Sequence, residues 1–219
     1  MTERLRIPPA EITGLYGEMI KRYSKRMFGD VPESVAVAWH SRPVVKFTMG
    51  IAQHTAKWNE VDASLKEWAH MAVAARVGCS FCLDLGYFTA HNEGMDEAKA
   101  REVPRWRESD AFTPLERDVM EYAEAMTQTP PTVTDELSSH LLDALGAPGL
   151  VELTAYIGVA NYYARMNVAV GVGSQGLADG LGLPPLATTA GWPSGQDSAE
   201  SVDEGTTYSA ERHPALRSA

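Results

Sequence analysis

Hydrophobic positions recur along most of the chain at intervals of three or four residues, which is the period of an amphipathic α-helix. One such run starts near Ser64, and its apolar positions are Leu65, Trp68, Ala69, Ala72, Val73 and Val77. Alternating runs of β-branched residues, which are typical of strands, are hardly present. The pattern therefore predicts an all-α fold, a bundle of several helices.

Prolines, glycines and small polar residues divide this pattern into separate helices. Thr113, Pro114 and Glu116 combine an N-cap, a first-turn proline and a capping-box glutamate, so a helix is expected to begin there. Gly78 interrupts the helix that Asp62 or Ser64 can cap. The predicted helices cover about 10–28, 35–39, 44–58, 64–77, 79–92, 114–127, 134–145 and 148–172.

The composition changes near residue 187, where glycine, serine, threonine, proline and acidic residues begin to dominate. Trp192 and Tyr208 are the only large rings after that point, which is too little apolar surface to offset the entropy lost on ordering. We therefore predict one helical domain over residues 1–186, with N-terminal helices at about 8–58 packing on it, and a flexible tail over 187–219.

The chain has 219 residues and a formal net charge of −10. The electric field of this negative charge repels nucleic acid and anionic lipid. Its most apolar window, 150–172, contains Glu152, Asn161, Arg165 and Asn167, which a membrane-spanning helix would bury at high cost. The N-terminus lacks the apolar stretch of a secretory signal. We expect a cytoplasmic protein with neither nucleic acid nor a membrane as partner.

The two cysteines of the chain, Cys79 and Cys82, are three residues apart just after Gly78. If a new helix begins there, its unpaired N–H groups and positive dipole end favour a thiolate, and both sulfurs share one helical face. This spacing favours a redox pair. The residues alone also permit a zinc site completed by His70 or His91, a structural disulfide, or two small core residues.

The segment from Glu67 to Cys82 resembles the signature of the carboxymuconolactone decarboxylase and alkylhydroperoxidase D superfamily: Glu, eleven residues, CxxC, three residues, His. Glu67, Cys79 and Cys82 match in register, and the similarity extends over roughly residues 40–185. It implies an all-helical homo-oligomer with antioxidant, peroxiredoxin-like activity that reduces hydroperoxides without a metal or organic cofactor. An external dithiol would then be its reductant.

Carried over by position, the resemblance also implies a role for each matched residue. Cys82 would be the attacking thiolate and Cys79 the resolving cysteine, which condenses with the sulfenic acid to form a disulfide. Glu67 would move the proton. The alternative is that Glu67 only completes a capping box with Ser64 at the helix start.

This sequence departs from the family pattern where the family carries histidines. Gly86 stands four residues after the second cysteine, and Ser80 and Phe81 fill the CxxC interior. Three nearby side chains are candidate substitutes in the proton relay: Asp84, His70 and His91. The alternatives are that His70 is an interior histidine and that His91 only favours the negative end of its helix.

Two other functions are compatible with the sequence. The superfamily includes decarboxylases that act without a cysteine pair, so a lyase is the first alternative, against which the two cysteines in register argue. The second is a non-enzymatic, redox-sensing helical protein. The leading prediction is a thiol-dependent peroxidase or disulfide oxidoreductase acting on a hydroperoxide or another small molecule.

Overall fold

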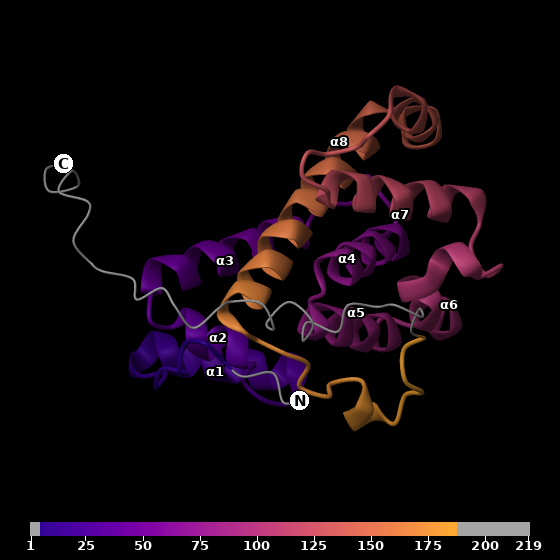
Figure 1. Cartoon of the computed structure of the whole chain (residues 1–219). Helices are drawn as coiled ribbons and strands as arrows, with labels where there is room; N and C mark the ends of the chain where they lie inside the picture. The colour runs from indigo at the N-terminus through magenta and orange to yellow at the C-terminus, as the bar shows by residue number, and fades with distance from the viewer. Residues whose placement is uncertain (1–4, 188–219) are drawn as a thin grey trace, which may run out of the picture.

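The computed structural model describes residues 5–187, which form helices joined by short loops (Figure 1). No strand occurs in this range, which confirms the predicted all-α fold. The helices are α1 (Gly14–Phe28), α2 (Glu33–Ala38), α3 (Arg42–Thr55), α4 (Ala63–Val77), α5 (Ser80–Asn92), α6 (Glu97–Glu102), the 3-10 helix η1 (Val103–Glu108), α7 (Pro114–Thr127), α8 (Asp135–Val170) and the 3-10 turn η2 (Asp179–Leu181).

Local sequence features set several of these boundaries as predicted. Thr113 and Glu116 form the capping box that starts α7. The side chain of Asp62, rather than that of Ser64, caps α4. The first helix begins at Gly14, later than the prolines suggested, because the preceding segment is extended and Ala10 donates its N–H to the carbonyl of Ala36 (3.1 Å).

Helix α8 joins the two helices predicted over 134–145 and 148–172. They meet at Gly146, whose φ of 69° breaks the helical geometry immediately before the turn that contains Pro148. By length and composition alone, α8 could cross a membrane, a test that the core helix of a soluble protein also passes. One face of α8 packs on the bundle through Leu153 and Ile157, both fully buried.

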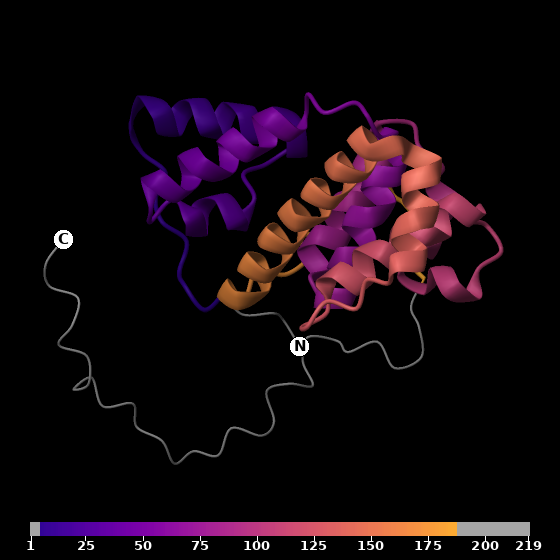
Figure 2. The same cartoon turned by 90° about the horizontal axis from the view of Figure 1, so that it is seen from above.

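The interior has two separate hydrophobic clusters. The larger lies among α4, α5, α7 and α8, with the loop after α8 closing one end. The smaller belongs to the N-terminal helices and is formed by Ile12, Ile20, Trp39 and Val45. Figure 2 shows α8 running diagonally between α1–α3 on one side and the remaining helices on the other.

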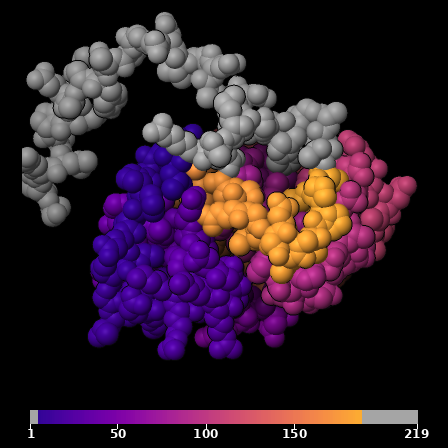
Figure 3. All heavy atoms as spheres, turned by 90° about the horizontal axis from the view of Figure 1, so that it is seen from below, coloured from indigo at the N-terminus to yellow at the C-terminus, as the bar shows by residue number. Residues whose placement is uncertain are grey.

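A few contacts join the N-terminal helices to the bundle. Tyr163 of α8 donates its hydroxyl to the carbonyl of Thr48 in α3 (2.9 Å), and Phe47 packs edge-on against Tyr162. In Figure 3 the end of the described chain lies between the N-terminal helices and the helices of the bundle. The tail predicted over 187–219 lies outside the described residues except for Ala187. The N–H of Ala187 donates to the backbone carbonyl of Arg101 (3.0 Å).

Candidate active site

The cysteine pair lies at the sharp turn between α4 and α5. Gly78 ends α4 in the left-handed conformation (φ 79°, ψ 31°), which glycine adopts without strain. Cys79 then serves as the N-cap of α5, and its sulfur accepts a hydrogen bond from the backbone N–H of Cys82 (3.2 Å). The predicted position of the pair at the start of a new helix is confirmed.

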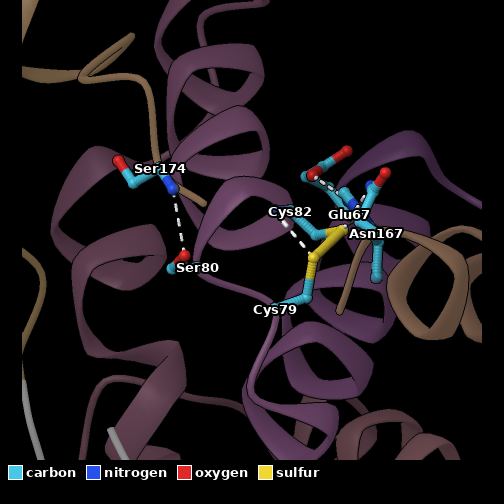
Figure 4. Close-up of a disulfide and its surroundings, with 7 residues drawn as sticks. Glu67, Cys79, Ser80, Cys82, Asn167 and Ser174 are labelled. Atoms are coloured by element: carbon cyan, nitrogen blue, oxygen red, sulfur yellow. Dashed lines mark hydrogen bonds and ion pairs between the residues drawn. A yellow bond between two sulfur atoms is a disulfide. The ribbon is translucent and has the colours of Figure 1, made fainter. Parts of the chain in front are cut away.

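Cys79 and Cys82 are joined by a disulfide, with their Cα atoms 5.3 Å apart (Figure 4). Cys79 is fully buried, and Cys82 retains 2% of its surface. The two sulfurs nevertheless differ in their surroundings, because Cys82 contributes to the lining of a cavity and Cys79 does not. Any molecule that reaches the pair through this cavity therefore meets Cys82 first.

The cavity has a volume of about 560 Å³ and lies between the N-terminal helices and the bundle. Most of its lining is apolar or aromatic, and it is large enough for a small organic molecule. The apolar and aromatic residues around it include Val45, Met49, Trp58, Phe81, Leu85, Tyr156, Val159, Tyr163 and Met166. Its polar lining includes Glu67, His70 and Asn167.

Glu67 and His70 form a hydrogen-bonded pair on the α4 side of this cavity. Oε1 of Glu67 lies 2.9 Å from Nδ1 of His70, and their side chains are 8% and 15% exposed. The helix start is completed by Asp62, which accepts from the N–H and hydroxyl of Ser64. The carboxylate of Glu67 is thus directed to an imidazole rather than to the helix start.

The side chains around Gly86, as they are placed in the structure, leave no room for a side chain at this position. A Cβ atom there would lie 2.5 Å from Cγ of Met71 and 2.8 Å from Oε1 of Glu67. Gly86 stands one turn after Cys82 in α5, so the Glu67 carboxylate lies against the helical face that carries Cys82. His70 supplies the nearby imidazole from α4 instead.

Two tyrosines of α8, Tyr156 and Tyr163, line the cavity. Burial, and after it the negative charge of Glu67, raises the pKa of Tyr156. Burial also raises the pKa of Tyr163 to about 12. The raised pKa values favour the neutral form of both phenols, and the Tyr163 hydroxyl donates to the carbonyl of Thr48. Tyr156 precedes Ala160 by four residues, and Tyr163 follows Tyr156 by seven, so the three residues share one helical face. The helical period alone does not show whether such a face lines a cavity or packs in the core.

Asp84 lies away from this group of residues and holds the segment after α8. Its Oδ2 accepts hydrogen bonds from the hydroxyl of Ser174 (2.9 Å) and the N–H groups of Gln175 (3.1 Å) and Leu177 (2.9 Å). Its Oδ1 accepts from the N–H of Ala178 (2.9 Å). The structure therefore does not bring Asp84 together with Glu67 and His70.

His91 is not among the residues that line the cavity, and it forms a partly exposed pair with Glu97 (2.7 Å). Within residues 5–187, no three His, Cys, Asp or Glu side chains cluster so that they could hold a metal ion. Of the six candidate residues, the structure brings together Cys79, Cys82, Glu67 and His70.

Asn167 is a member of this site that the sequence did not single out for chemistry. It lies in the last turn of α8, 4% exposed, and its Nδ2 is 3.5 Å from the sulfur of Cys82. Figure 4 shows Glu67 and Asn167 on the Cys82 side of the pair, while Ser80 and Ser174 lie on the other side. Because 85 residues separate Asn167 from Cys82, only the folded structure reveals this contact.

The family model of the carboxymuconolactone decarboxylase family matches residues 42–125, from α3 to α7. The chain is 32% identical over 155 residues to the uncharacterized protein YnjA of Escherichia coli, an alignment that covers 70% of this chain and 85% of YnjA.

Solved structures with low sequence identity share the fold. The debrominase Bmp8, crystallised as a cysteine-to-alanine variant with 2,3,4-tribromopyrrole, is 15% identical with a TM-score of 0.72, covering 82% of this chain and 97% of that one. A peroxidase-related protein from Silicibacter sp. TM1040 is 13% identical with a TM-score of 0.67, covering 78% and 91%. The match to the family model and the similarity to YnjA of E. coli together show that the chain belongs to the carboxymuconolactone decarboxylase family.

Proposed function

We propose that this protein is a thiol-dependent oxidoreductase that reduces organic hydroperoxides through Cys79 and Cys82. One observation carries the proposal: the disulfide-forming pair presents a single sulfur, that of Cys82, to an apolar cavity also lined by the Glu67–His70 pair. A nucleophile, a resolving partner and a proton-transfer group are thus held together.

In the proposed reaction, the Cys82 thiolate attacks one oxygen of the hydroperoxide and the O–O bond breaks. The sulfur becomes a sulfenic acid, and the leaving alkoxide takes a proton from the Glu67–His70 pair to become an alcohol. The Cys79 thiol then displaces hydroxide from the sulfenic acid, which forms the disulfide and releases water. An external dithiol reduces the disulfide and is itself oxidised to a disulfide.

The cavity supports an organic hydroperoxide over hydrogen peroxide as the preferred substrate. Its volume of about 560 Å³ far exceeds what hydrogen peroxide needs, and its lining is mainly apolar and aromatic. Apolar area removed from water contributes roughly 25 cal/mol per Å² to binding, so a bulky apolar group would lower KM.

The proposal includes a cytoplasmic location, a dithiol partner and assembly of the chain as a homo-oligomer. A reducing compartment would supply the dithiol that the cycle requires. Support for self-association comes from α1, where four large side chains spaced four residues apart are exposed. These are Leu15, Met19, Tyr23 and Met27.

The test is consumption of cumene hydroperoxide under excess dithiothreitol by the wild type, Cys82→Ser and Cys79→Ser. We expect steady turnover by the wild type, at least tenfold slower turnover by Cys79→Ser, and only background consumption by Cys82→Ser. Hydrogen peroxide should react with a lower kcat/KM than cumene hydroperoxide. Equal, slow consumption by all three proteins would contradict the proposal.

A second candidate function is reductive removal of a halogen from an aromatic ring. It is favoured by the aromatic side chains of Trp58, Tyr156 and Tyr163 around the cavity and by the shared fold with a debrominase. Here the carbon–bromine bond would break, bromide would leave, a proton would add to the ring carbon, and the two thiols would be oxidised to the disulfide. Release of bromide from a brominated pyrrole or phenol under dithiothreitol distinguishes this reaction from peroxide reduction.

A further inference from the structure

The side chain of Asn167 has no part in ending its own helix. At the end of α8, the backbone carbonyl of Asn167 accepts the N–H of Val172 (2.9 Å), and Gly171 adopts the left-handed conformation. These contacts involve only the backbone. The side-chain amide is therefore available, and its Nδ2 is directed at the sulfur of Cys82 at 3.5 Å.

Cys82 needs such a donor more than Cys79 does. Burial in apolar surroundings disfavours a thiolate, and Cys82 is 2% exposed. The backbone N–H of Cys82, in the first turn of α5, donates to the sulfur of Cys79 (3.2 Å) rather than to the sulfur of Cys82. The sulfur of Cys82 accepts a hydrogen bond from the side-chain amide of Asn167 instead.

We propose that Asn167 is the hydrogen-bond donor that stabilises the Cys82 thiolate and so makes Cys82 the reactive sulfur of the pair. A hydrogen bond to an ionised sulfur is stronger than one to a neutral thiol, so the donor favours the charged form. The proposal deepens the proposed function and rests on it, because it takes Cys82 to be the sulfur that reacts.

The test measures thiolate formation without any substrate. In a Cys79→Ser background, Cys82 is the one remaining thiol of the chain, and its ionisation can be followed by ultraviolet thiolate absorbance across a pH titration. The absorbance of the Cys79→Ser/Cys82→Ser double variant is subtracted. The substitutions are Asn167→Leu, which removes the donor at similar size, and Asn167→Asp, which replaces the donor by an acceptor.

We expect the midpoint of Cys82 ionisation to rise by about one pH unit in Asn167→Leu and by more in Asn167→Asp. The matched control is Asn161→Leu in the same helix, whose amide instead donates to Thr127 (3.0 Å) and Ile157 (3.2 Å). That substitution should leave the midpoint unchanged. Circular dichroism of each variant identifies any that fails to fold, and the isosteric Asn167→Asp provides a second variant should Asn167→Leu not fold.

An unchanged midpoint in folded Asn167→Leu and Asn167→Asp would overturn the proposal, as would an equal rise in Asn161→Leu. The result is independent of the proposed function, since the titration uses no hydroperoxide. A raised midpoint together with no peroxide turnover in the wild type would support the role of Asn167 at the sulfur and contradict peroxide reduction. An unchanged midpoint in the Asn167 variants together with rapid peroxide turnover by the wild type would contradict the role of Asn167 and support peroxide reduction.

Discussion

The carboxylate of Glu67 occupies the space into which a side chain at Gly86 would extend. A Cβ atom at Gly86 would lie 2.8 Å from Oε1 of Glu67 and 2.5 Å from Cγ of Met71, which is fully buried. The Glu67 carboxylate on α4 can therefore occupy this position because residue 86 of α5 is a glycine. The nearby imidazole, His70, extends from the same helix as the acid it contacts.

Gly86→Ala should displace the Glu67 carboxylate and Met71. We expect a loss of about 1–3 kcal/mol in the free energy of unfolding, measured by urea denaturation, because the added methyl group overpacks the core. Hydroperoxide turnover should fall as well, since the acid moves. The control is Gly158→Ala in α8, where an added Cβ meets nothing within 4 Å. That variant should be as stable as the wild type or more stable.

His70→Gln should slow the steps that need proton transfer. General acid–base groups typically contribute on the order of 100-fold or more, so we expect a drop of about that size in kcat/KM for cumene hydroperoxide. His91→Gln is the control, because His91 pairs with Glu97 outside the cavity. Equal kcat/KM values for His70→Gln and His91→Gln would exclude His70 from the proton relay.

Asp84→Asn should destabilise the protein and leave the chemistry intact. Asp84 accepts hydrogen bonds from three N–H groups and one hydroxyl of the segment after α8. In Asp84→Asn, the side-chain NH₂ group would face some of these donors and could not accept their hydrogen bonds. We expect a loss of about 2–4 kcal/mol in urea denaturation and near wild-type turnover per folded molecule. A much larger loss of turnover than of folded protein would show that Asp84 takes part in the reaction.

Glu116→Gln should remove part of the acid sensitivity of the fold. Burial raises the pKa of Glu116, but hydrogen bonds from Lys99 and Thr113 outweigh it and lower the pKa below its usual 4.5. A lowered pKa in the folded state means that the ionised carboxylate stabilises the protein above about pH 4.5 and that this stability is lost as the pH falls through the folded-state pKa.

The measurement is urea denaturation of the wild type and Glu116→Gln at about pH 7 and about pH 3. At neutral pH the variant should be less stable by about 2 kcal/mol, and the difference should shrink at the acidic pH. A difference that stays constant between the two pH values would show that Glu116 contributes nothing to the pH dependence.

The features that the sequence predicted correctly depend on residues close together in the chain. The capping box of Thr113 and Glu116 and the left-handed turn at Gly78 are local, so helix boundaries could be predicted from them. The spacing of Cys79 and Cys82 likewise placed both sulfurs at one helix start.

The features that the sequence left open depend on contacts between distant segments. Asp84 is a plausible proton acceptor until its partners, about 90 residues further along, are known. In the sequence, Asn167 is one polar residue of an apolar helix. Its contact with the sulfur of Cys82 is visible only in the folded structure. The cavity itself is formed only when the N-terminal helices pack beside α4, α5 and α8. Periodicity gives no information about such pairings.

The identity of the sulfur that reacts first is the most direct test of the account. Reduced Cys79→Ser and Cys82→Ser are each treated with one equivalent of cumene hydroperoxide, and the intact masses are measured with and without a sulfenic acid trap. We expect Cys79→Ser to gain one oxygen atom on Cys82 that the trap captures, because Cys82 lines the cavity. We expect no gain for Cys82→Ser. Trapped oxygen on Cys79 alone, or on neither cysteine, would contradict the account.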